Sequence, residues 1–319
     1  MTAIVALLLL CVVAFLSLMF GAVTLSPAEV VSGLTSKDDV FARNVVWQIR
    51  YPRLIDGAFV GASLATAGAL LQGVTRNPLA DPTILGVTAA AGLASATALV
   101  ISPETHQAAL TLYCAMGGVA GGIVLFFIAW RGTVSPVRLA LSGVALSAFL
   151  GAAIVGILAS SRTFLQTSLG FLAGGMYGSE WNDLWAALPW VVGGISAATL
   201  IGGRLNVLAL GDDVALGLGI MTDRTRLAIL AVVGILTGVA VAIGGLVSFV
   251  GLVCPHLARF AVGNDYRVVI PTSALIGAVL VTAADLTARV IISPSEIPMG
   301  IITAGVGAPF LLYLVKVRG

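Results

Sequence analysis

The sequence predicts an all-α polytopic membrane protein. Of the 319 residues, 59% are hydrophobic and only 9% are charged, whereas about a quarter of the residues in a soluble domain are charged. The mean hydropathy is +1.09. Apolar stretches of about 18 residues or more recur along the chain, and each can cross about 30 Å of hydrocarbon as a helix. These observations exclude a soluble fold and predict one transmembrane domain over residues 1–319, embedded in a lipid bilayer.

Ten transmembrane helices are expected, because polar residues divide the apolar sequence into ten runs. The runs cover residues 2–23, 54–74, 84–101, 108–130, 138–160, 184–203, 226–245, 247–262, 270–292 and 299–316. The first run has no basic segment before it and exceeds the apolar core of most signal peptides, so we expect a transmembrane helix there. Glycine pairs spaced four apart would let neighbouring helices pack closely. They include Gly57 and Gly61, Gly117 and Gly121, and Gly234 and Gly238.

An even number of spans places both termini on one side of the membrane. Lys316 and Arg318 close to the C-terminus favour the cytoplasm, since cytoplasmic loops are enriched in Lys and Arg. The same side then carries Arg76, Arg131, Arg138, Arg204, Arg224, Arg226, Arg259 and Arg267. Outside or near the outer face are Lys37, Arg43, Arg50, Arg53, Arg162 and Arg289. We therefore expect a multi-pass protein of the plasma membrane (the inner membrane in a two-membrane bacterium) with both termini cytoplasmic.

The sequence contains no nucleotide-binding loop of the form GxxxxGK followed by Ser or Thr. Its only lysines, Lys37 and Lys316, are followed by Asp38 and Val317. Any ATP must therefore act through another subunit. The chain offers no candidate catalytic residue and is not expected to be an enzyme. No basic run interleaved with aromatic residues indicates nucleic acid.

No metal site and no cofactor are expected. The two histidines, His106 and His256, have no partner at the spacing of zinc or haem ligands, so each is expected to have a structural role. Cys11, Cys114 and Cys254 lie in apolar stretches. We expect them to be buried thiols that pack as small apolar side chains.

One pair of opposite charges lies within a predicted span. Asp285 and Arg289 are four residues apart in the run 270–292, and residues at this spacing share one face of a helix. An aspartate at the centre of a bilayer costs about 2.5–3.5 kcal/mol on insertion scales, so a partner is expected. The pattern favours an ion pair over a proton relay, which would need further acids and histidines.

The predicted outer loop ends in WQIRYPRLIDG, residues 47–57, with Arg50 and Arg53 just before the second span. Two interpretations are open. Interfacial arginines often extend toward lipid phosphates. Alternatively, the two guanidinium groups form an outward docking site for acidic side chains, because arginine binds carboxylates through two parallel hydrogen bonds.

Two predicted inner loops carry denser signals. In GVTRNPLADPTILG, residues 73–86, Pro78 and Pro82 prevent a continuous helix. The second loop, about 204–226, contains LALGDDVALGLGI, residues 208–220.

In the second loop, a first short helix is expected to include Leu205, Val207 and Leu208, with Gly211 ending it. Asp212 can cap a second helix whose first turn also favours Asp213. Val214 and Leu218 would share one face, and Gly219 would end that helix. Interfacial helices are usually rich in Lys and Arg on the polar face, whereas this one is acidic. We therefore expect it to bind a groove on a soluble partner.

The motifs resemble those of FecCD-type permeases, the membrane subunits of ABC importers for iron-siderophores, haem and vitamin B12. The resemblance begins with RYPRLIDGAFVGASLATAGALLQGVTRNPLADPTILGVTAAAG and continues through the segments 171–184, 205–220, 244–260 and 284–315. The matches follow in order and span nearly the whole chain. The family is expected to have the type II importer fold. Each subunit of this fold has ten helices, and two subunits pair around a central path.

The resemblance also implies partners and residue roles. Two cytoplasmic ATPase subunits bind below, a substrate-binding protein docks above, and a second permease copy or a related chain completes the pair. The residues expected to couple transport to the ATPase are Leu208, Gly211, Asp212, Asp213, Val214, Leu218 and Gly219. Arg50, Arg53 and Arg289 would receive acidic residues of the binding protein. Asn77 and Ser135 would contribute to the cytoplasmic gate.

The segment FLAGGMYGSEW, residues 171–181, resembles siderophore permeases most, so a ferric siderophore is the expected substrate. Haem and cobalamin remain alternatives within the same family. A gradient-driven carrier is less favoured because intramembrane acids are scarce. A membrane enzyme or haem-based electron carrier is disfavoured because paired histidines are missing.

Overall fold

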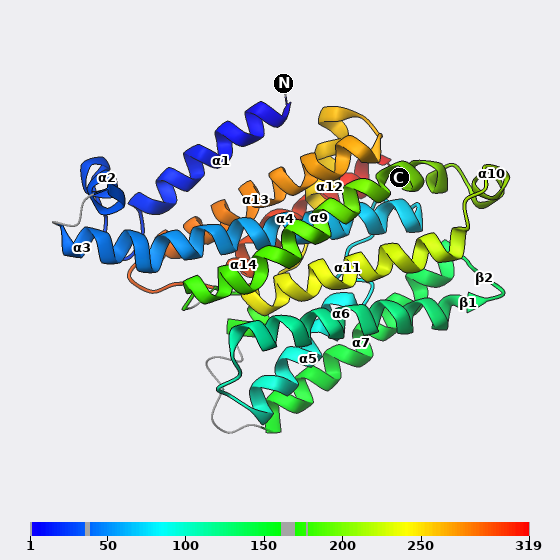
Figure 1. Cartoon of the computed structure of the whole chain (residues 1–319), viewed down its shortest axis with the longest axis horizontal. Coiled ribbons are helices and arrows are strands. Elements are labelled where there is room, and N and C mark those ends of the chain that lie inside the picture. Colours follow the sequence, from blue (N-terminus) through cyan, green and yellow to red (C-terminus); the bar gives the residue numbers. More distant parts are fainter. Residues whose placement is uncertain (1, 36–38, 161–169, 177, 319) are drawn as a thin grey trace.

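The computed structural model describes residues 2–35, 39–160, 170–176 and 178–318. Lys37 and Arg162, expected on the outer side, lie outside these ranges. Ten helices form the body of the molecule and run side by side along its long axis (Figure 1). They are α1 (Thr2–Met19), α4 (Tyr51–Thr75), α5 (Val87–Ile101), α6 (Gln107–Ala129), α7 (Pro136–Ser160), α9 (Trp181–Ala209), α11 (Thr222–Gly244), α12 (Val250–Val262), α13 (Tyr266–Val290) and α14 (Met299–Arg318).

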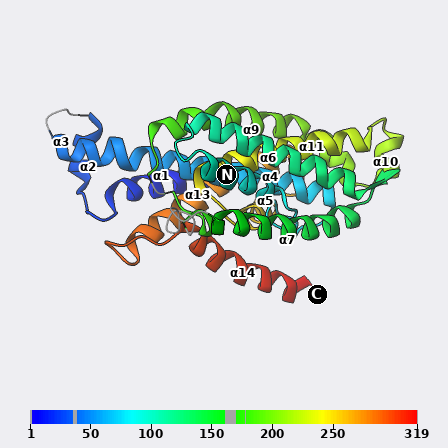
Figure 2. The same cartoon turned by 90° about the horizontal axis from the view of Figure 1, so that it is seen from below.

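Short elements cap the two ends of this bundle. One end carries α2 (Pro27–Thr35), α3 (Val40–Arg43) and a π-helical segment, η1 (Asn44–Arg50), that leads into α4. The opposite end carries α10 (Asp212–Gly217) and a hairpin of two antiparallel strands, β1 (Trp130–Arg131) and β2 (Thr133–Val134). Figures 1 and 2 both place these groups at opposite ends of the long axis. We refer to the two ends as the α2 end and the α10 end.

Six helices, not ten, are long and apolar enough to cross a membrane within the described residues, so the predicted count of ten full spans is wrong. The six are Val40–Thr75, Gln107–Ala129, Pro136–Ser160, Trp181–Ala209, Thr222–Gly244 and Tyr266–Val290. The other four predicted spans coincide with shorter apolar helices of 10–17 residues. They are Ala3–Met19, Val87–Ile101, Val250–Val262 and Met299–Leu314.

Two of the short helices have a clear physical reason for their length. The turn before α5 is folded into the bundle, where Asp81 and Leu85 are buried. The segment before α12 is buried in the same way at Val247. Non-helical backbone at membrane depth is tolerated where protein surrounds it. The apolar residues at the start of the predicted spans 84–101 and 247–262 therefore belong to these buried turns and not to helices.

Helix α4 lies at the centre of the bundle, and almost all of it from Val60 to Thr75 is buried. It packs against α9, α11, α12 and α13. Glycine makes these contacts close: a Cβ added at Gly61 would lie 2.0 Å from the carbonyl oxygen of Gly277, and one at Gly68 would lie 2.0 Å from that of Gly251. The expectation that small residues allow close helix contact is confirmed here.

The thiols differ in their surroundings. Cys114 and Cys254 are buried as expected, whereas Cys11 is exposed. The prediction for Cys11 is wrong because α1 lies at the edge of the bundle, where it packs mainly against α13. Helices α7 and α14 are also peripheral, with large apolar side chains exposed at Leu141, Phe149 and Leu312. Figure 2 shows α14 on the outside of the bundle.

Candidate coupling, docking and transport sites

The loop between α9 and α11 forms one short helix rather than two. Leu205, Val207 and Leu208 continue α9, which ends at Ala209. The expected separate helix is therefore wrong, because Leu205 and Leu208 are fully buried and hold the last turns of α9 against the core. Gly211, with φ +129°, links α9 to α10 as the N-cap of α10 instead of ending a helix of its own.

The second helix, α10, forms as predicted over Asp212–Gly217. Asp212 and Asp213 occupy its first turn, where the positive end of the helix dipole favours negative charge. Gly219, with φ +77°, ends the element. Few L-residues adopt this left-handed conformation without strain. The turn therefore redirects the chain into α11 within a few residues.

The surface of this loop is apolar. Leu210, Val214, Leu216, Leu218 and Met221 are all 46–69% exposed, and we call these five residues the coupling patch. Ala215 points the other way and is fully buried. An apolar surface cluster of this kind marks an interaction site in a protein, and this one lies at the extreme α10 end of the molecule (Figure 1).

Asp212 has a different role from the coupling patch. Its Oδ1 accepts a hydrogen bond from Arg226 on α11 at 2.7 Å, and it also bonds to Arg76 at the end of α4. Arg226 is only 1% exposed. Its second partner, Asp223, lies 3.7 Å away and also accepts from the backbone N–H of Val134 in the hairpin. Asp212 therefore ties α10 to α4 and α11, whereas Asp213 is exposed.

The two predicted gate residues lie on separate turns at the α10 end. Asn77 Oδ1 accepts from the backbone N–H of Leu79 at 2.9 Å, which shapes the turn after α4. The Ser135 carbonyl accepts from the N–H of Leu139 at 2.9 Å and opens α7. Among the residues with described positions, no hydrogen bond joins Asn77 to Ser135. The turn reaches α7 at another point, where Ser147 Oγ donates to the Thr83 carbonyl at 2.8 Å.

At the α2 end, the three arginines predicted to dock a partner are bonded within the protein. Arg50 is 4% exposed and donates to the Leu18 carbonyl at 2.6 Å and to the Val23 carbonyl. Arg289 is 5% exposed and donates to Ser17 Oγ at 2.5 Å. Arg50 therefore does not extend to lipid phosphates, and neither of these two arginines offers a free guanidinium at the surface.

Arg53 joins two acids. It contacts Asp285 Oδ1 at 2.9 Å and Glu296 Oε2 at 2.8 Å. Asp285 Oδ2 also lies 3.0 Å from Arg289 Nε, so the predicted pair between Asp285 and Arg289 is confirmed. Sequence reasoning missed Glu296, because nothing in the sequence brings it to an arginine 243 residues away. Of the three arginines, only Arg53 bonds to a partly exposed carboxylate.

A cavity of about 710 Å³ lies toward the same end, and three segments, two of which contain glycine, build most of it. These segments run over residues 170–175, 241–245 and 296–298. Ser95 of α5 and Leu110 of α6 close the cavity. Among the lining residues, Glu296 is the only charged one. The cavity is therefore connected to the arginine network through Glu296.

Backbone bonds hold the three segments together. The N–H of Leu246 donates to the Phe171 carbonyl at 3.0 Å, and the N–H of Gly300 donates to the Gly174 carbonyl at 3.0 Å. A Cβ at Gly245 would lie 2.5 Å from the Phe171 carbonyl oxygen. Close backbone approach thus requires glycine at position 245, and the cavity walls combine glycines with apolar side chains such as Phe171 and Ile243.

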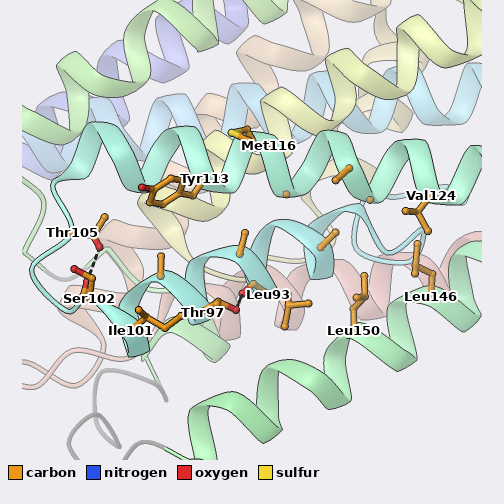
Figure 3. A pocket seen from close by; sticks show the side chains of 16 residues that line it. Leu93, Thr97, Ile101, Ser102, Thr105, Tyr113, Met116, Val124, Leu146 and Leu150 are labelled. Atoms are coloured by element: carbon orange, nitrogen blue, oxygen red, sulfur yellow. Dashed lines mark hydrogen bonds between the residues drawn. The ribbon is translucent and has the colours of Figure 1, made fainter.

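A second cavity, of about 700 Å³, is a groove between α5 and α6. Figure 3 shows Leu93 and Thr97 on α5 facing the α6 side that carries Tyr113, with Leu146 and Leu150 of α7 at one end. Thr97 Oγ1 donates to the Leu93 carbonyl at 2.7 Å, and Thr105 Oγ1 donates to the Ser102 carbonyl at 2.6 Å. These hydroxyls are already bonded to their own backbone. The groove suits apolar contacts better than a polar solute.

The histidines have packing and capping roles. His106 Nδ1 accepts from the N–H of Ala108 at 3.3 Å at the start of α6. His256 lies edge-on to Phe260 and Phe310, with ring centroids 4.9 and 5.5 Å apart. Neither histidine belongs to a group of three metal-binding side chains within the described ranges.

Comparisons with known proteins identify the family to which this chain is similar. The model of the FecCD transport family matches residues 8–317. The chain is 40% identical over 301 residues to the Fe(3+)-citrate import system permease protein YfmD of Bacillus subtilis, covering 94% of this chain and 90% of that protein. It is 41% identical over 270 residues to the Fe(3+) dicitrate transport system permease protein FecD of Escherichia coli, covering 85% and 84%.

A cobalamin relative is equally similar. The chain is 40% identical over 278 residues to the cobalamin import system permease protein BtuC of Halobacterium salinarum, covering 87% of this chain and 74% of that protein. A solved chain described as an inward-facing conformation of a proposed metal-chelate type ABC transporter superposes with a TM-score of 0.85 at 30% identity, covering 98% of both chains. The chain belongs to the FecCD transport family of ABC importer permeases.

Proposed function

We propose that this chain is the membrane-spanning subunit of an ABC importer for a ferric chelate, of the siderophore or citrate class. The observation that carries the proposal is the family match over residues 8–317, together with curated relatives whose names specify ferric-citrate and ferric-hydroxamate import. The whole chain acts as one transmembrane domain. ATP hydrolysis belongs to a separate subunit.

The coupling patch supports the contact with that ATPase. Its five apolar side chains are exposed at the end of the molecule and suit an apolar groove on a soluble partner. Within the set predicted for coupling, Val214 and Leu218 make the contact. Leu208, Gly211 and Gly219 determine the shape of the loop that carries α10. Asp212 links the position of α10 to α4 and α11. We assign the α10 end to the cytoplasm, as the arginines there favour.

Docking of a substrate-binding protein involves Arg53 first. Arg50 and Arg289 are buried and hold α1 against α4 and α13. Arg53 instead bonds to Glu296, whose side chain is 26% exposed. An acidic residue of the binding protein can replace Glu296 at Arg53, since a guanidinium binds any carboxylate in the same geometry. Docking then frees the loop that carries Glu296.

The cavity toward the α2 end forms one part of the transport path. A ferric chelate is polar, and a cavity whose lining includes Ser95 and Glu296 suits it better than the apolar groove between α5 and α6. The exposed apolar faces of α7 and α14 suit a second permease subunit, which would complete the path. Asn77 and Ser135 close it on the cytoplasmic side, at the turns before α5 and α7.

A cobalamin substrate is the second candidate, because the BtuC relative is as similar in sequence as the ferric-citrate relatives. Uptake of radiolabelled iron as ferric citrate and as a ferric hydroxamate, in cells with and without this chain, separates the two. We expect chain-dependent iron uptake that persists with an uncoupler and stops when ATP is depleted. Chain-dependent uptake of labelled cobalamin without iron uptake would assign the second substrate, and uptake that stops with the uncoupler at constant ATP would contradict the ABC mechanism.

A further inference from the structure

A pocket of about 400 Å³ opens between α9 and α11 near the α10 end. Its walls include Ile201 and Arg204 from α9, and Arg224 and Ala228 from α11. The pocket is separate from the cavity at the α2 end and from the groove between α5 and α6. None of the residues assigned above to docking or gating lines it.

The two arginines bring positive charge to this pocket without a matching carboxylate. Both are exposed, and neither forms an ion pair within the part of the chain that the structure describes. Two acids of the same loop are occupied elsewhere: Asp212 bonds to Arg76 and Arg226, and Asp223 accepts from the N–H of Val134. The pocket is therefore an anion-attracting site that the protein leaves open.

The pocket also has an apolar side, which lies deeper in the helix bundle than its two arginines. Ile201 and Arg204 share one face of α9, and Arg224 and Ala228 share one face of α11. On each wall the apolar residue lies about 5 Å deeper in the bundle than the arginine. Leu200, next to Ile201, is 84% exposed in a helix apolar enough to span a membrane. We therefore expect hydrocarbon at the level of Ile201 and lipid headgroups at the level of the arginines.

We infer that this pocket binds the phosphodiester of an anionic phospholipid in the leaflet at the α10 end. Guanidinium groups bind phosphate oxygens through paired, charge-assisted hydrogen bonds, and basic pockets between membrane helices recognise anionic headgroups. An acyl chain then lies against Ile201 and Ala228. A free phosphate would use the same arginines, but it would gain nothing from the apolar wall. Lipid is therefore the occupant that both halves of the pocket fit.

The position of the pocket gives the lipid a place in the transporter. Met221 lines the pocket and also belongs to the coupling patch. The bound headgroup would lie directly beside the surface proposed to contact the ATPase. The inference does not depend on the transported substrate, so it can hold or fail independently of the proposed function.

Native mass spectrometry of the purified permease assembly tests the site. Phosphatidylglycerol and phosphatidylcholine with the same acyl chains are supplied together, and the retained lipid is counted. We expect preferential retention of phosphatidylglycerol, reduced about fivefold by Arg204→Gln or Arg224→Gln alone and about 25-fold by both, from the contribution of one basic residue at an anionic surface. The matched control, Arg131→Gln with Arg267→Gln, removes two exposed charges at the same end and should leave the preference unchanged.

Four results would overturn the inference. Equal retention of the two lipids by the unaltered protein would show that the pocket does not select anionic lipid. An equal loss in the control would show that general positive charge at this end, and not this pocket, attracts the lipid. Displacement of phosphatidylglycerol by millimolar inorganic phosphate, with the same arginine dependence, would indicate a site for free phosphate. Loss of ATPase co-purification in the double variant, with lipid retention unchanged, would assign the arginines to the protein contact.

Discussion

The carboxylate of Asp212 at the start of α10 accepts a hydrogen bond from the buried guanidinium of Arg226 at 2.7 Å. The same oxygen bonds to Arg76, which ends α4. Because α4 is the central helix, a movement of α10 reaches the core through this carboxylate rather than through a flexible loop. Asp212 therefore acts inside the protein, beside a patch that acts on its surface.

Asp212→Asn should weaken coupling while leaving ATPase binding intact. The amide keeps the shape but removes the charge that balances Arg226, and loss of a hydrogen bond between charged groups costs about 1.5–3 kcal/mol. Thermal unfolding should show a lower midpoint, and ATP-driven uptake should fall more than ATPase co-purification. Glu104→Gln, at an exposed position of the α2 end, is the control and should change neither. Full uptake by the Asp212 variant would show that the bonds of Asp212 to Arg76 and Arg226 are not needed for coupling.

Leu218→Asp should detach the ATPase. Burying a leucine side chain contributes about 1.5–3 kcal/mol, so replacing it by a charge should reduce affinity about tenfold or more. Co-purification of the ATPase with the tagged permease measures this directly. Val40→Asp makes the same kind of change at an exposed position of the α2 end. It should leave ATPase binding unchanged, and comparable losses in both variants would point to misfolding instead.

Glu296→Gln should strengthen docking of the substrate-binding protein. The neutral amide competes less well for Arg53, so an incoming carboxylate would find the guanidinium less occupied. We expect affinity to rise severalfold in a surface-based binding assay with the permease in lipid nanodiscs. Glu104→Gln removes an exposed charge at the same end and serves as the control. Weaker docking by the Glu296 variant would mean that Glu296 supports the contact.

Asp265 should make stability depend on pH at the α10 end. It caps α13, and hydrogen bonds from Asn206 at 2.6 Å and from the Arg267 backbone at 2.9 Å lower its pKa. Since the pKa is lower in the folded protein, this stabilisation is complete above the ordinary value of about 4 and is lost as the pH falls through the lowered value. The unfolding midpoint of Asp265→Asn should lack that acid-dependent component, whereas Asp213→Asn should retain it.

Local spacing was enough to predict part of this structure. Asp285 and Arg289 are four residues apart on one helix, so their pair follows from helix geometry. The helical start near Asp212 likewise follows from the preference of acidic residues for the first turn, although Gly211 and not Asp212 is the N-cap. Both features depend on residues within one or two turns of each other.

Other features depend on tertiary contacts that a sequence pattern does not contain. The partners of Arg50 are carbonyls of Leu18 and Val23, in a segment about 30 residues earlier. Leu205 and Leu208 extend α9 because the core buries them, although the glycine after them suggested an earlier break. The short α5 follows from burial of the turn around Asp81, whose last residues, Ile84 and Leu85, are as apolar as a helix would be.

The glycine contacts of α4 determine where this protein can change shape. Gly61 and Gly68 lie two turns apart on one face, and there the backbone of α4 rests on the backbones of α13 and α12. No side chain lies between them that could change rotamer and absorb a displacement. Helices α4, α12 and α13 thus form a fixed spine. The peripheral helices α7 and α14 would therefore carry the movements of an alternating cycle around that spine.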